Sequence, residues 1–208
     1  MLQNDTVITI EDFGAGSTAT KSNQRVVKQI AATSLKSKKY ARLLFRMVQY
    51  YQPTSIIELG TSLGITTAYL ANGNPSARVY SCEGATAIAA LAQQNFNQLD
   101  LKNIQLITGN FTSTLPALLQ QINTVQLAFI DGNHRQQPTL DYFTQLLPAT
   151  NRNSILIFDD IHWSAEMEAA WAQIKDHPAV TLSIDLFFIG IVFFNPDFKA
   201  KQHFVIRF

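Results

Sequence analysis

Apolar, strand-like runs alternate with helix-like patterns along most of this chain, and this alternation constrains its fold more than any other feature. The helix-like patterns carry apolar residues at intervals of three and four, and they begin and end between the runs. Such an alternation is typical of a parallel sheet whose strands are joined by helices. The strand-like runs are Ser55 to Leu59, Val79 to Cys82, Ile104 to Ile107, Val125 to Ile130 and Ser154 to Phe158.

The end of the chain departs from this alternation. Its three apolar runs are strand-like, and the segments between them leave no room for helices. We therefore expect these strands to pair antiparallel, because parallel partners need a long connection. The three runs are Val180 to Asp185, Phe188 to Phe194 and His203 to Phe208.

The chain divides into two segments of unequal length. Residues 1–36 contain one short strand candidate, Thr6 to Ile10, and the glycine-rich stretch Gly14 to Ser17. A phosphate loop at this stretch is disfavoured, because the preceding strand is short and the following helical pattern is polar. We expect a lid or a substrate-side segment instead. Residues 37–208 are long enough to form one α/β domain around a buried sheet, in a chain that is 47% hydrophobic.

Charge and cysteine content exclude several classes of function. The 16 basic and 15 acidic residues give a net charge of +1, which provides no basic field for nucleic acid or a membrane surface. The single cysteine, Cys82, excludes a disulfide framework and a cysteine zinc site. No basic-then-apolar leader follows Met1, and no apolar stretch approaches the ~20 residues of a spanning helix. We expect a cytoplasmic protein whose partner is a small molecule.

A strand runs into a glycine turn at Ile56 to Gly60, and a helical pattern begins at Ile65. Backbone N–H groups at the start of that helix would face a crevice suited to a polar or negatively charged ligand. The spacing from Gly60 to Gly64 lacks the third glycine of the dinucleotide fingerprint. Glu58 would repel a pyrophosphate and attract an ammonium or sulfonium group. Alone, the two glycines also fit a tight turn without a ligand.

An acidic residue, Glu83, ends the next predicted strand. A carboxylate about 20 residues after the glycine turn is the expected partner of a ribose, because it accepts hydrogen bonds from both ribose hydroxyls. Taken alone, Glu83 could equally be a charge at the start of a helix. Its agreement in position with Glu58, Gly60 and Gly64 favours an adenosine-containing ligand.

The run from Glu58 to Thr66 and the following Glu83 resemble the first two motifs of the class I S-adenosylmethionine-dependent methyltransferases. Within that class, the chain is most similar to the O-methyltransferase group of catechol and caffeoyl-CoA methyltransferases and their bacterial relatives. Phe129 to His134 adds to this resemblance, which covers about Tyr40 to Phe208. It implies a Rossmann-like α/β fold, with a seven-stranded, mostly parallel sheet, helices on both faces and a C-terminal antiparallel hairpin.

The resemblance also implies roles for individual residues. Gly60 and Ser62 would lie along S-adenosylmethionine, Thr66 would reach its methionine carboxylate, and Glu83 would bind its ribose. Gly109 and Asn110, after the third strand, would border the adenine. The expected cofactor-binding residues are Glu58, Gly60, Thr61, Ser62, Gly64, Thr66, Glu83, Gly84, Gly109, Asn110 and Asp131.

Three acidic residues, Asp131, Asp159 and Asp160, follow the fourth and fifth predicted strands. They should project from the carboxyl edge of the sheet. A bound divalent cation such as Mg²⁺ or Ca²⁺ is one way in which their negative charge could be balanced. The resembled O-methyltransferases bind such a metal with an acid after strand four and an acid-plus-amide pair after strand five. In this chain the corresponding pair consists of two acids, Asp159 and Asp160, and contains no amide. The alternative is that Asp131 contacts the cofactor, Asp159 caps a loop amide and Asp160 is solvated.

His134 lies three residues after Asp131 and is the expected general base, because an imidazole with a pKa near ~6.5 can take a proton near neutral pH. Asp131 and His134 are thus the predicted catalytic residues. An ordinary surface histidine is the alternative for His134. His162 and Trp163, just after the aspartate pair, could line the same pocket.

The predicted function is therefore O-methyl transfer from S-adenosylmethionine to a small-molecule hydroxyl. A nicotinamide-dependent oxidoreductase is disfavoured by Glu58 and by the glycine spacing. A catalytically silent cofactor-binding or scaffold protein is compatible with the same residues. The apolar final hairpin could form the edge of a homodimer, although a buried sheet edge would need the same residues.

Overall fold

The computed structural model describes residues 1, 3–9, 24–33 and 36–208. Within it, the chain forms two compact units, Met1–Thr114 and Leu115–Phe208. The boundary between the units falls inside the segment 37–208. The expected separation of residues 1–36 from the rest therefore stays a prediction. Gly14 to Ser17 lies outside the described residues.

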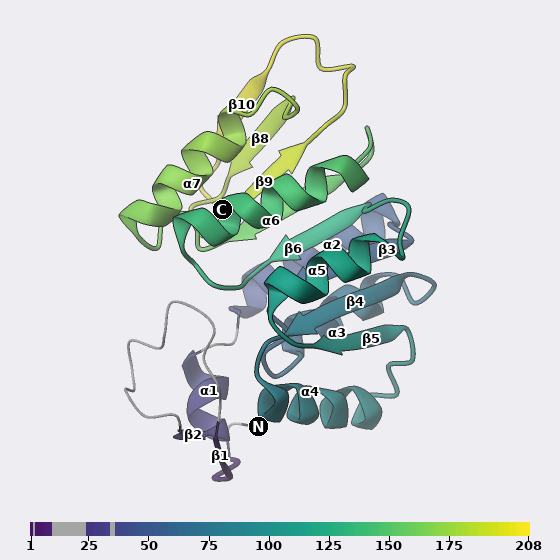
Figure 1. The fold of residues 1–208 in the computed structure, drawn as a ribbon, viewed down its shortest axis with the longest axis vertical. Helices are drawn as coiled ribbons and strands as arrows, with labels where there is room; N and C mark the ends of the chain where they lie inside the picture. The colour runs from purple at the N-terminus through teal and green to yellow at the C-terminus, as the bar shows by residue number, and fades with distance from the viewer. Residues whose placement is uncertain (2, 10–23, 34–35) are drawn as a thin grey trace. The chain divides into compact units, whose positions relative to one another are not determined.

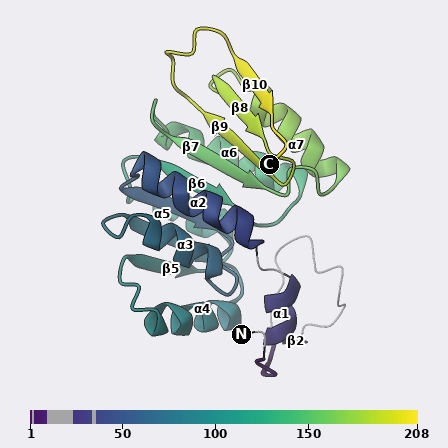
Figure 2. The same ribbon diagram turned by 180° about the vertical axis from the view of Figure 1, so that it is seen from behind.

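The first unit contains three parallel strands in the order β3-β4-β5. Because they run parallel, their carboxyl ends lie at one edge of the sheet. Helices α2 and α3 cover one face of these strands, as the views from the front and from behind both show (Figure 1 and Figure 2). The elements are β1 (Val7–Thr9), β2 (Gln24–Val26), α1 (Val27–Thr33), α2 (Lys38–Tyr51), β3 (Ser55–Leu59), α3 (Ile65–Gly73), β4 (Arg78–Glu83), α4 (Thr86–Gln98) and β5 (Ile104–Thr108).

The second unit contains five strands in the order β6-β7-β9-β8-β10. β6 and β7 run parallel, and β9 is antiparallel to both of its neighbours, β7 and β8. Helices α6 and α7 lie on one face of these strands, in front of them in Figure 1 and behind them in Figure 2. The elements are β6 (Leu127–Ile130), α6 (Gln136–Leu146), η1 (Leu147–Ala149), β7 (Ile155–Asp159), α7 (Ala165–Asp176), β8 (Leu182–Asp185), β9 (Ile189–Phe193) and β10 (Gln202–Val205), while α5 (Phe111–Leu119) crosses the boundary between the units.

The expected α/β fold with a mostly parallel sheet is confirmed. Strands β3 to β7 each coincide with an expected run to within two residues. Their side chains are almost all buried on both faces in β3, β6 and β7, as continuous apolar runs predict. The expected hairpin is also present, with Asp185 opposite Gly190 where β8 turns into β9.

The last strand corrects the expectation drawn from the sequence. β10 pairs parallel with β8 rather than antiparallel, with Gln202 N donating to Thr181 O at 3.0 Å and Ile206 N donating to Asp185 O at 2.8 Å. Both edges of β9 are already bonded to β7 and β8, so β10 can join only at the outer edge of β8. The connection of residues 194–201 returns the chain to the beginning of β8, which makes the pairing parallel. β10, which overlaps the expected run His203 to Phe208, is thus an edge strand, and it is the strand that exceeds the seven implied by the resemblance.

The N-terminal elements pack against the rest of the first unit. β1 and β2 form a short antiparallel ladder, in which Val7 is opposite Val26. The buried side of α1, formed by Val27 and Ile30, packs in one cluster with Leu63 of the glycine turn and Ile88 of α4. This segment therefore covers the outside of the glycine turn. Within the described residues, none of the helices has the length and apolar character required to span a membrane.

Candidate functional site

The glycine turn joins β3 to α3 at the carboxyl edge of the first unit's sheet. Gly60 N and Thr61 N both donate to Cys82 O, at 2.9 and 3.2 Å, and so continue the β3–β4 ladder into the turn. Ser62, at a φ of 48°, reverses the chain before α3 begins. The turn is therefore held by β4, and the N–H groups of the first turn of α3 are left to face this edge.

Gly64 is required by both the backbone and the packing. Its φ of 80° is a left-handed conformation, which costs residues with a Cβ about 1–2 kcal/mol. A Cβ added at this position would also overlap the ring of Phe96 on α4. The glycine lets the turn lie directly on α4.

Substitution of Gly64 by alanine is expected to lower the free energy of unfolding by about 2 kcal/mol, from backbone strain and overpacking. Equilibrium unfolding in urea measures this loss. In a Phe96→Leu background the same substitution should cost less, because the edge of the ring is gone. If Gly64→Ala leaves the free energy of unfolding unchanged in both the wild-type and the Phe96→Leu background, this account of the turn is contradicted.

Glu58 lies beneath the turn rather than on its surface. The residue is fully buried, and its Oε2 accepts hydrogen bonds from Thr67 Oγ1 and Ser81 Oγ, both at 2.5 Å. Thr61 Oγ1 lies 2.5 Å from Ser81 Oγ and extends the network into the turn. Buried carboxylates are stable only when hydrogen-bonded in this way. Glu58 therefore ties β3, β4 and α3 together under the loop.

Glu83 ends β4 and holds the two loops on either side of it. Its Oε2 accepts from Ser62 N at 2.8 Å, and its Oε1 accepts from Ala85 N at 2.9 Å. The carboxylate is thus fixed by two backbone donors, and each oxygen has a second lone pair. Gly84 lies between Glu83 and Ala85 on the β4–α4 connection. Glu83 is the one predicted residue that contacts the glycine turn directly from β4.

The remaining predicted cofactor residues of the first unit lie at the same edge. Thr66 is in the first turn of α3 and is buried. Gly109 follows β5 with a φ of 141°, and its N–H donates to Glu83 O at 2.9 Å. The side chain of Asn110 accepts from Thr112 N at 3.0 Å and so begins α5. The loops after β3, β4 and β5 are therefore joined by hydrogen bonds through Glu83.

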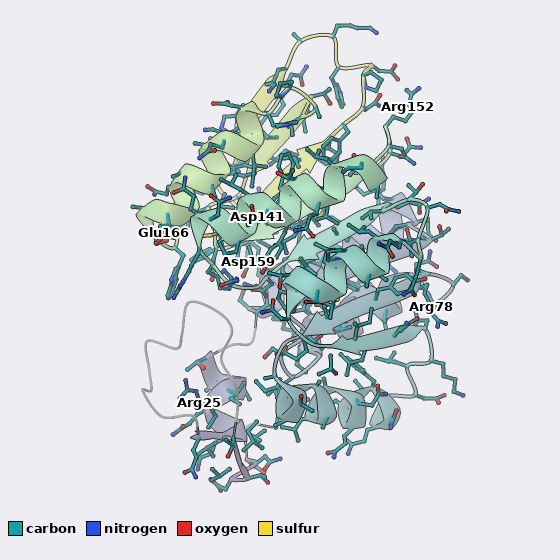
Figure 3. The ribbon with its side chains drawn as sticks, viewed as in Figure 1. Arg25, Arg78, Asp141, Arg152, Asp159 and Glu166 are labelled. Carbon is teal, nitrogen blue, oxygen red and sulfur yellow. The ribbon has the colours of Figure 1, made fainter. Side chains whose placement is uncertain are left out.

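In the second unit, the structure brings together Asp131, His134 and Asp159. One ligand atom from each lies within 4.8 Å of the other two. His134 Nε2 is 3.5 Å from Asp131 Oδ1, and both side chains are partly exposed. Asp159, which is labelled in Figure 3, ends β7, and its side chain is buried. Among the described residues, Asp160 is not part of this group, although it was expected to be.

The backbone around this cluster is unusual. Asn133 and His134 have φ values of 71° and 38°, and Asp160 has a φ of 53°. Left-handed conformations are rare for residues other than glycine, and they concentrate at functional sites. The side chain of Asn133 donates to Tyr142 OH at 3.2 Å, which fixes the loop onto α6. The cluster therefore stands on a loop that the surrounding structure constrains.

The donor set fits a divalent cation. Two carboxylates and an imidazole have ligand atoms within 4.8 Å of one another, and such residues are ligands for divalent metals. An imidazole nitrogen in place of a third oxygen would extend the choice from Mg²⁺ and Ca²⁺ toward Mn²⁺ or Zn²⁺. Without a cation, the same carboxylates would stabilise a protonated His134.

A family profile described as a methyltransferase domain matches residues 57–161, about half of the chain. This stretch begins in β3 and includes the glycine turn, Glu83 and the cluster of Asp131, His134 and Asp159. The chain belongs to the methyltransferase-domain family. The resemblance identified from the sequence is thereby confirmed.

Individual relatives agree with this assignment. A tRNA (guanine-N(7)-)-methyltransferase of Mycoplasma mobile is 36% identical over 95 residues, which are 44% of this chain and 47% of the relative. A catechol O-methyltransferase of Niastella koreensis is 28% identical over 123 residues, 58% of this chain and 55% of the relative. The chain thus spans about half the length of these curated relatives. An O-methyltransferase from Bacillus cereus, solved in complex with SAH, shares the fold with a TM-score of 0.66 at 22% identity, over 80% of this chain and 88% of that one.

This methyltransferase domain holds a second cluster of titratable groups, of which sequence reasoning singled out only His162. His162 Nε2 lies 2.9 Å from Asp185 Oδ2, and His162 Nδ1 lies 3.2 Å from Glu168 Oε1. Trp171 Nε1 donates to Asp185 Oδ2 at 3.2 Å. Asp185 ends β8 and looked like an ordinary strand residue, because its partners come from distant positions in the chain.

The charged groups of this cluster shift each other's pKa values. Partial burial by itself would lower the pKa of His162, but the hydrogen bonds to Asp185 and Glu168 outweigh it and raise that pKa. Burial would likewise raise the pKa of Asp185, but the hydrogen bonds from His162 and Phe187 outweigh it and lower that pKa. Both shifts favour the charged forms of the pair, an imidazolium beside a carboxylate.

Substitution of His162 by glutamine is expected to destabilise the methyltransferase most at about pH 5–6 and least at pH 9. The raised pKa of His162 gives stability that is complete below its unfolded value near ~6.5 and is lost as pH rises through the folded value. The lowered pKa of Asp185 gives stability that is lost only as pH falls through its folded value. Urea unfolding at both pH values measures the loss in the free energy of unfolding, with His203→Gln as the control. A loss that becomes larger as the pH rises would contradict the pairing of His162 with Asp185.

Proposed function

We propose that this protein is an S-adenosylmethionine-dependent methyltransferase that transfers the methyl group to the hydroxyl of a small molecule. The observation that carries the proposal is the Glu83 carboxylate, fixed by Ser62 N and Ala85 N beside the glycine turn. A carboxylate held in this way is preorganised to accept hydrogen bonds from the two hydroxyls of a ribose. The Bacillus cereus O-methyltransferase, which was solved with SAH, supports this choice of cofactor.

The other predicted cofactor residues are assigned to the same ligand. Gly60, Thr61, Ser62 and Gly64 would present backbone along the cofactor, and Thr66 would bind its methionine carboxylate. Glu58 would act from below, by keeping the turn in place and adding a negative charge near the ammonium and sulfonium groups. Gly84, Gly109 and Asn110 would border the adenosine, and Asp131 is proposed as a further contact.

The cluster of Asp131, His134 and Asp159 is proposed to act on the methyl acceptor. In the transfer, the bond from the methyl carbon to sulfur breaks as the bond to the acceptor oxygen forms, and the hydroxyl proton goes to His134. Asp131 would orient the imidazole and stabilise its protonated form. In the alternative arrangement these residues would hold a divalent cation, which would lower the pKa of the bound hydroxyl, and His134 would then be a ligand rather than the base. Asp160 would then remain outside the ligand set.

A product assay tests the proposed function. The purified protein is incubated with S-adenosylmethionine and a panel of phenols, aliphatic alcohols, amines and carboxylates, and S-adenosylhomocysteine formation is measured with and without EDTA. Methylation of hydroxyl compounds supports the proposal, and loss of activity in EDTA supports the cation. Turnover on none of the compounds, with the cofactor still bound, would indicate a catalytically silent binding protein.

Two alternatives are also tested: transfer RNA as the methyl acceptor, and a nicotinamide as the cofactor. The similarity to a tRNA methyltransferase makes transfer RNA a necessary member of the panel. The net charge of +1 argues against it, because nucleic-acid binding depends on a basic surface. A nicotinamide cofactor would be revealed by enhanced NADH fluorescence on mixing.

Three further proposals concern the surroundings of the site. Residues 1–36 are proposed to form a lid, supported by the packing of Val27 and Ile30 on Leu63. A homodimer is proposed through the exposed apolar side chains of β10, such as Phe204 and Val205. A cytoplasmic location is supported by the single, buried Cys82, whose pKa burial raises to about 12.

A further inference from the structure

The charges of this chain are distributed unevenly along its length. Residues 13–82 contain nine of the 16 basic residues and one of the 15 acidic residues, Glu58. Glu58 is fully buried beneath the glycine turn, so it places no carboxylate on the surface. The net charge of +1 is therefore an average over a basic part and an acidic remainder. A net charge near zero does not exclude a local basic surface.

Helix α2, which lies in front of the first unit's strands in Figure 2, concentrates this positive charge. One side of the helix is apolar and buried. On its exposed side, Lys38, Arg42 and Arg46 follow one another at intervals of four residues, and Tyr50 continues the series. Residues four apart are neighbours on a helix surface, so these four side chains form one stripe about 18 Å long. We call it the α2 stripe.

The α2 stripe lies on a layer of two helices that contain no acid. α2 and α3 pack side by side, and the sequence of neither helix includes an aspartate or a glutamate. Among the described residues, no carboxylate forms an ion pair with Lys38, Arg42 or Arg46. These three charges can therefore pair with a ligand from outside the chain.

The stability of the helix does not explain this arrangement of charges. The amino end of a helix is the positive end of its dipole and favours acids, yet the first turn of α2 contains Lys38 and Lys39 and no acid. Like charges four residues apart on a helix repel each other, which applies to Lys38 with Arg42 and to Arg42 with Arg46. The α2 stripe therefore weakens the helix that carries it, and a ligand of opposite charge would remove the repulsion.

An exposed aromatic ring completes the stripe at the carboxyl end of α2. Tyr50 is 82% exposed, and the ring of Tyr51 packs against it edge-on, with centroids 4.9 Å apart and an angle of 87°. The ring is thus held by its neighbour while most of its surface faces solvent. Cations beside an exposed ring are a combination that binds single-stranded nucleic acid, because the cations contact phosphates and the ring stacks on a base. An anionic membrane fits less well, because the apolar side of α2 is buried and cannot enter the lipid.

We infer that the α2 stripe binds single-stranded nucleic acid, with Lys38, Arg42 and Arg46 on phosphates and Tyr50 stacked on a base. The inference goes beyond the proposed function and does not depend on it. Every base has a face that can stack, and phosphates are the same in every sequence, so the surface should bind strands of different sequence alike.

Fluorescence anisotropy with labelled dodecamers of uridylate and of thymidylate tests the phosphate contacts. Binding of either strand by the full chain is expected to weaken with salt, with a slope of about 2 in log Kd against log salt, because each phosphate contact on a single strand contributes about 0.7. Replacement of Lys38, Arg42 and Arg46 together by glutamine should weaken binding about 100-fold at about 0.1 M salt and bring the slope close to zero. The control is Lys102→Gln, which removes an exposed cation outside the stripe and should change neither quantity.

The role of Tyr50 is tested with an abasic dodecamer, which has phosphates but no bases. The wild-type protein should bind the uridylate strand about tenfold more tightly than the abasic strand, because stacking adds to the phosphate contacts. Tyr50→Leu should bind the two strands about equally, and Tyr50→Phe should retain the preference. Phe204→Leu removes another exposed ring, on β10, and should also retain it.

The substitution Lys38→Glu separates binding from stability. An acid suits the first turn of a helix, and it would attract Arg42 instead of repelling it. Lys38→Glu should therefore unfold at a higher urea concentration than the wild type and still bind the uridylate strand at least tenfold more weakly. If Lys38 had a structural role only, its replacement would lower the urea midpoint and leave binding unchanged.

Three results would overturn the inference. The first is that the wild-type protein binds neither strand at low salt, and the second is that the triple glutamine variant binds them as tightly as the wild type. The third is that the wild type binds vesicles of phosphatidylserine and phosphatidylcholine through the α2 stripe but binds neither strand, which would assign the surface to a membrane. Urea unfolding of the triple variant checks that its fold is intact.

Discussion

Glutamine in place of Glu83 is expected to weaken the binding of S-adenosylhomocysteine about 100-fold. The carboxylate of Glu83 is held by Ser62 N and Ala85 N, and its two oxygens would accept hydrogen bonds from both ribose hydroxyls. Hydrogen bonds to a charged group contribute about 1.5–3 kcal/mol each, and a glutamine retains one acceptor but no charge. A loss of about 3 kcal/mol corresponds to about 100-fold in affinity. Titration calorimetry measures it directly.

The matched control for this change is Asp100→Asn. Asp100 is an exposed acid in the α4–β5 turn, and it has a left-handed φ of 54° that asparagine tolerates. The substitution Asp100→Asn removes the same charge at a position that does not contact the glycine turn. The affinity for S-adenosylhomocysteine should therefore be unchanged. Urea unfolding of both variants checks that the fold is intact. If Glu83→Gln binds the nucleoside as tightly as the control, Glu83 is not the ribose partner.

Alanine in place of His134 is expected to lower kcat by about 10²–10⁴-fold, the usual contribution of a general base. His134 Nε2 lies 3.5 Å from Asp131 Oδ1, and Asp159 completes the group. Removal of the imidazole leaves the hydroxyl proton without an acceptor, or a cation with one ligand fewer. The affinity for S-adenosylhomocysteine should not change, because the substitution is outside the glycine turn and its neighbours.

Comparison with two further variants identifies which role His134 has. His203→Ala, on β10, controls for the loss of an imidazole and should retain full activity. Asp160→Ala should also be active, because Asp160 lies outside the group. If His134 is a metal ligand, excess Mn²⁺ should restore part of the activity of His134→Ala; if it is the base, only higher pH should. A fully active His134→Ala would contradict both roles.

The strands and the glycine turn were predictable because their determinants are local. The apolar runs of β3 to β7 follow the period of a buried strand, and Gly60 and Gly64 stand where the chain needs a left-handed turn. The N-cap of α7 at Ser164 is equally local, because its side chain accepts from Met167 N at 3.2 Å. Such features depend on residues only a few positions apart.

Features that depend on distant partners were not predictable. The parallel pairing of β10 follows from the insertion of β9 between β7 and β8, which no local pattern records. The burial of Glu58 depends on Ser81, a residue of the next strand. Asp185 was missed for the same reason, because His162 comes to it from the loop before α7 and Trp171 comes from α7 itself. An acid at the end of an apolar strand, like Glu83 and Asp159, was the one available signal.

The most direct test of this account is calorimetric titration of S-adenosylhomocysteine into the wild-type protein. We expect one molecule to bind per chain, with protection of Gly60 to Gly64 and of Glu83 from hydrogen exchange. Because a ligand that binds only the folded state adds to its stability, the urea midpoint should rise with ligand concentration. Absence of binding heat, together with an unchanged midpoint at millimolar ligand, would contradict the assignment of this glycine turn to S-adenosylmethionine.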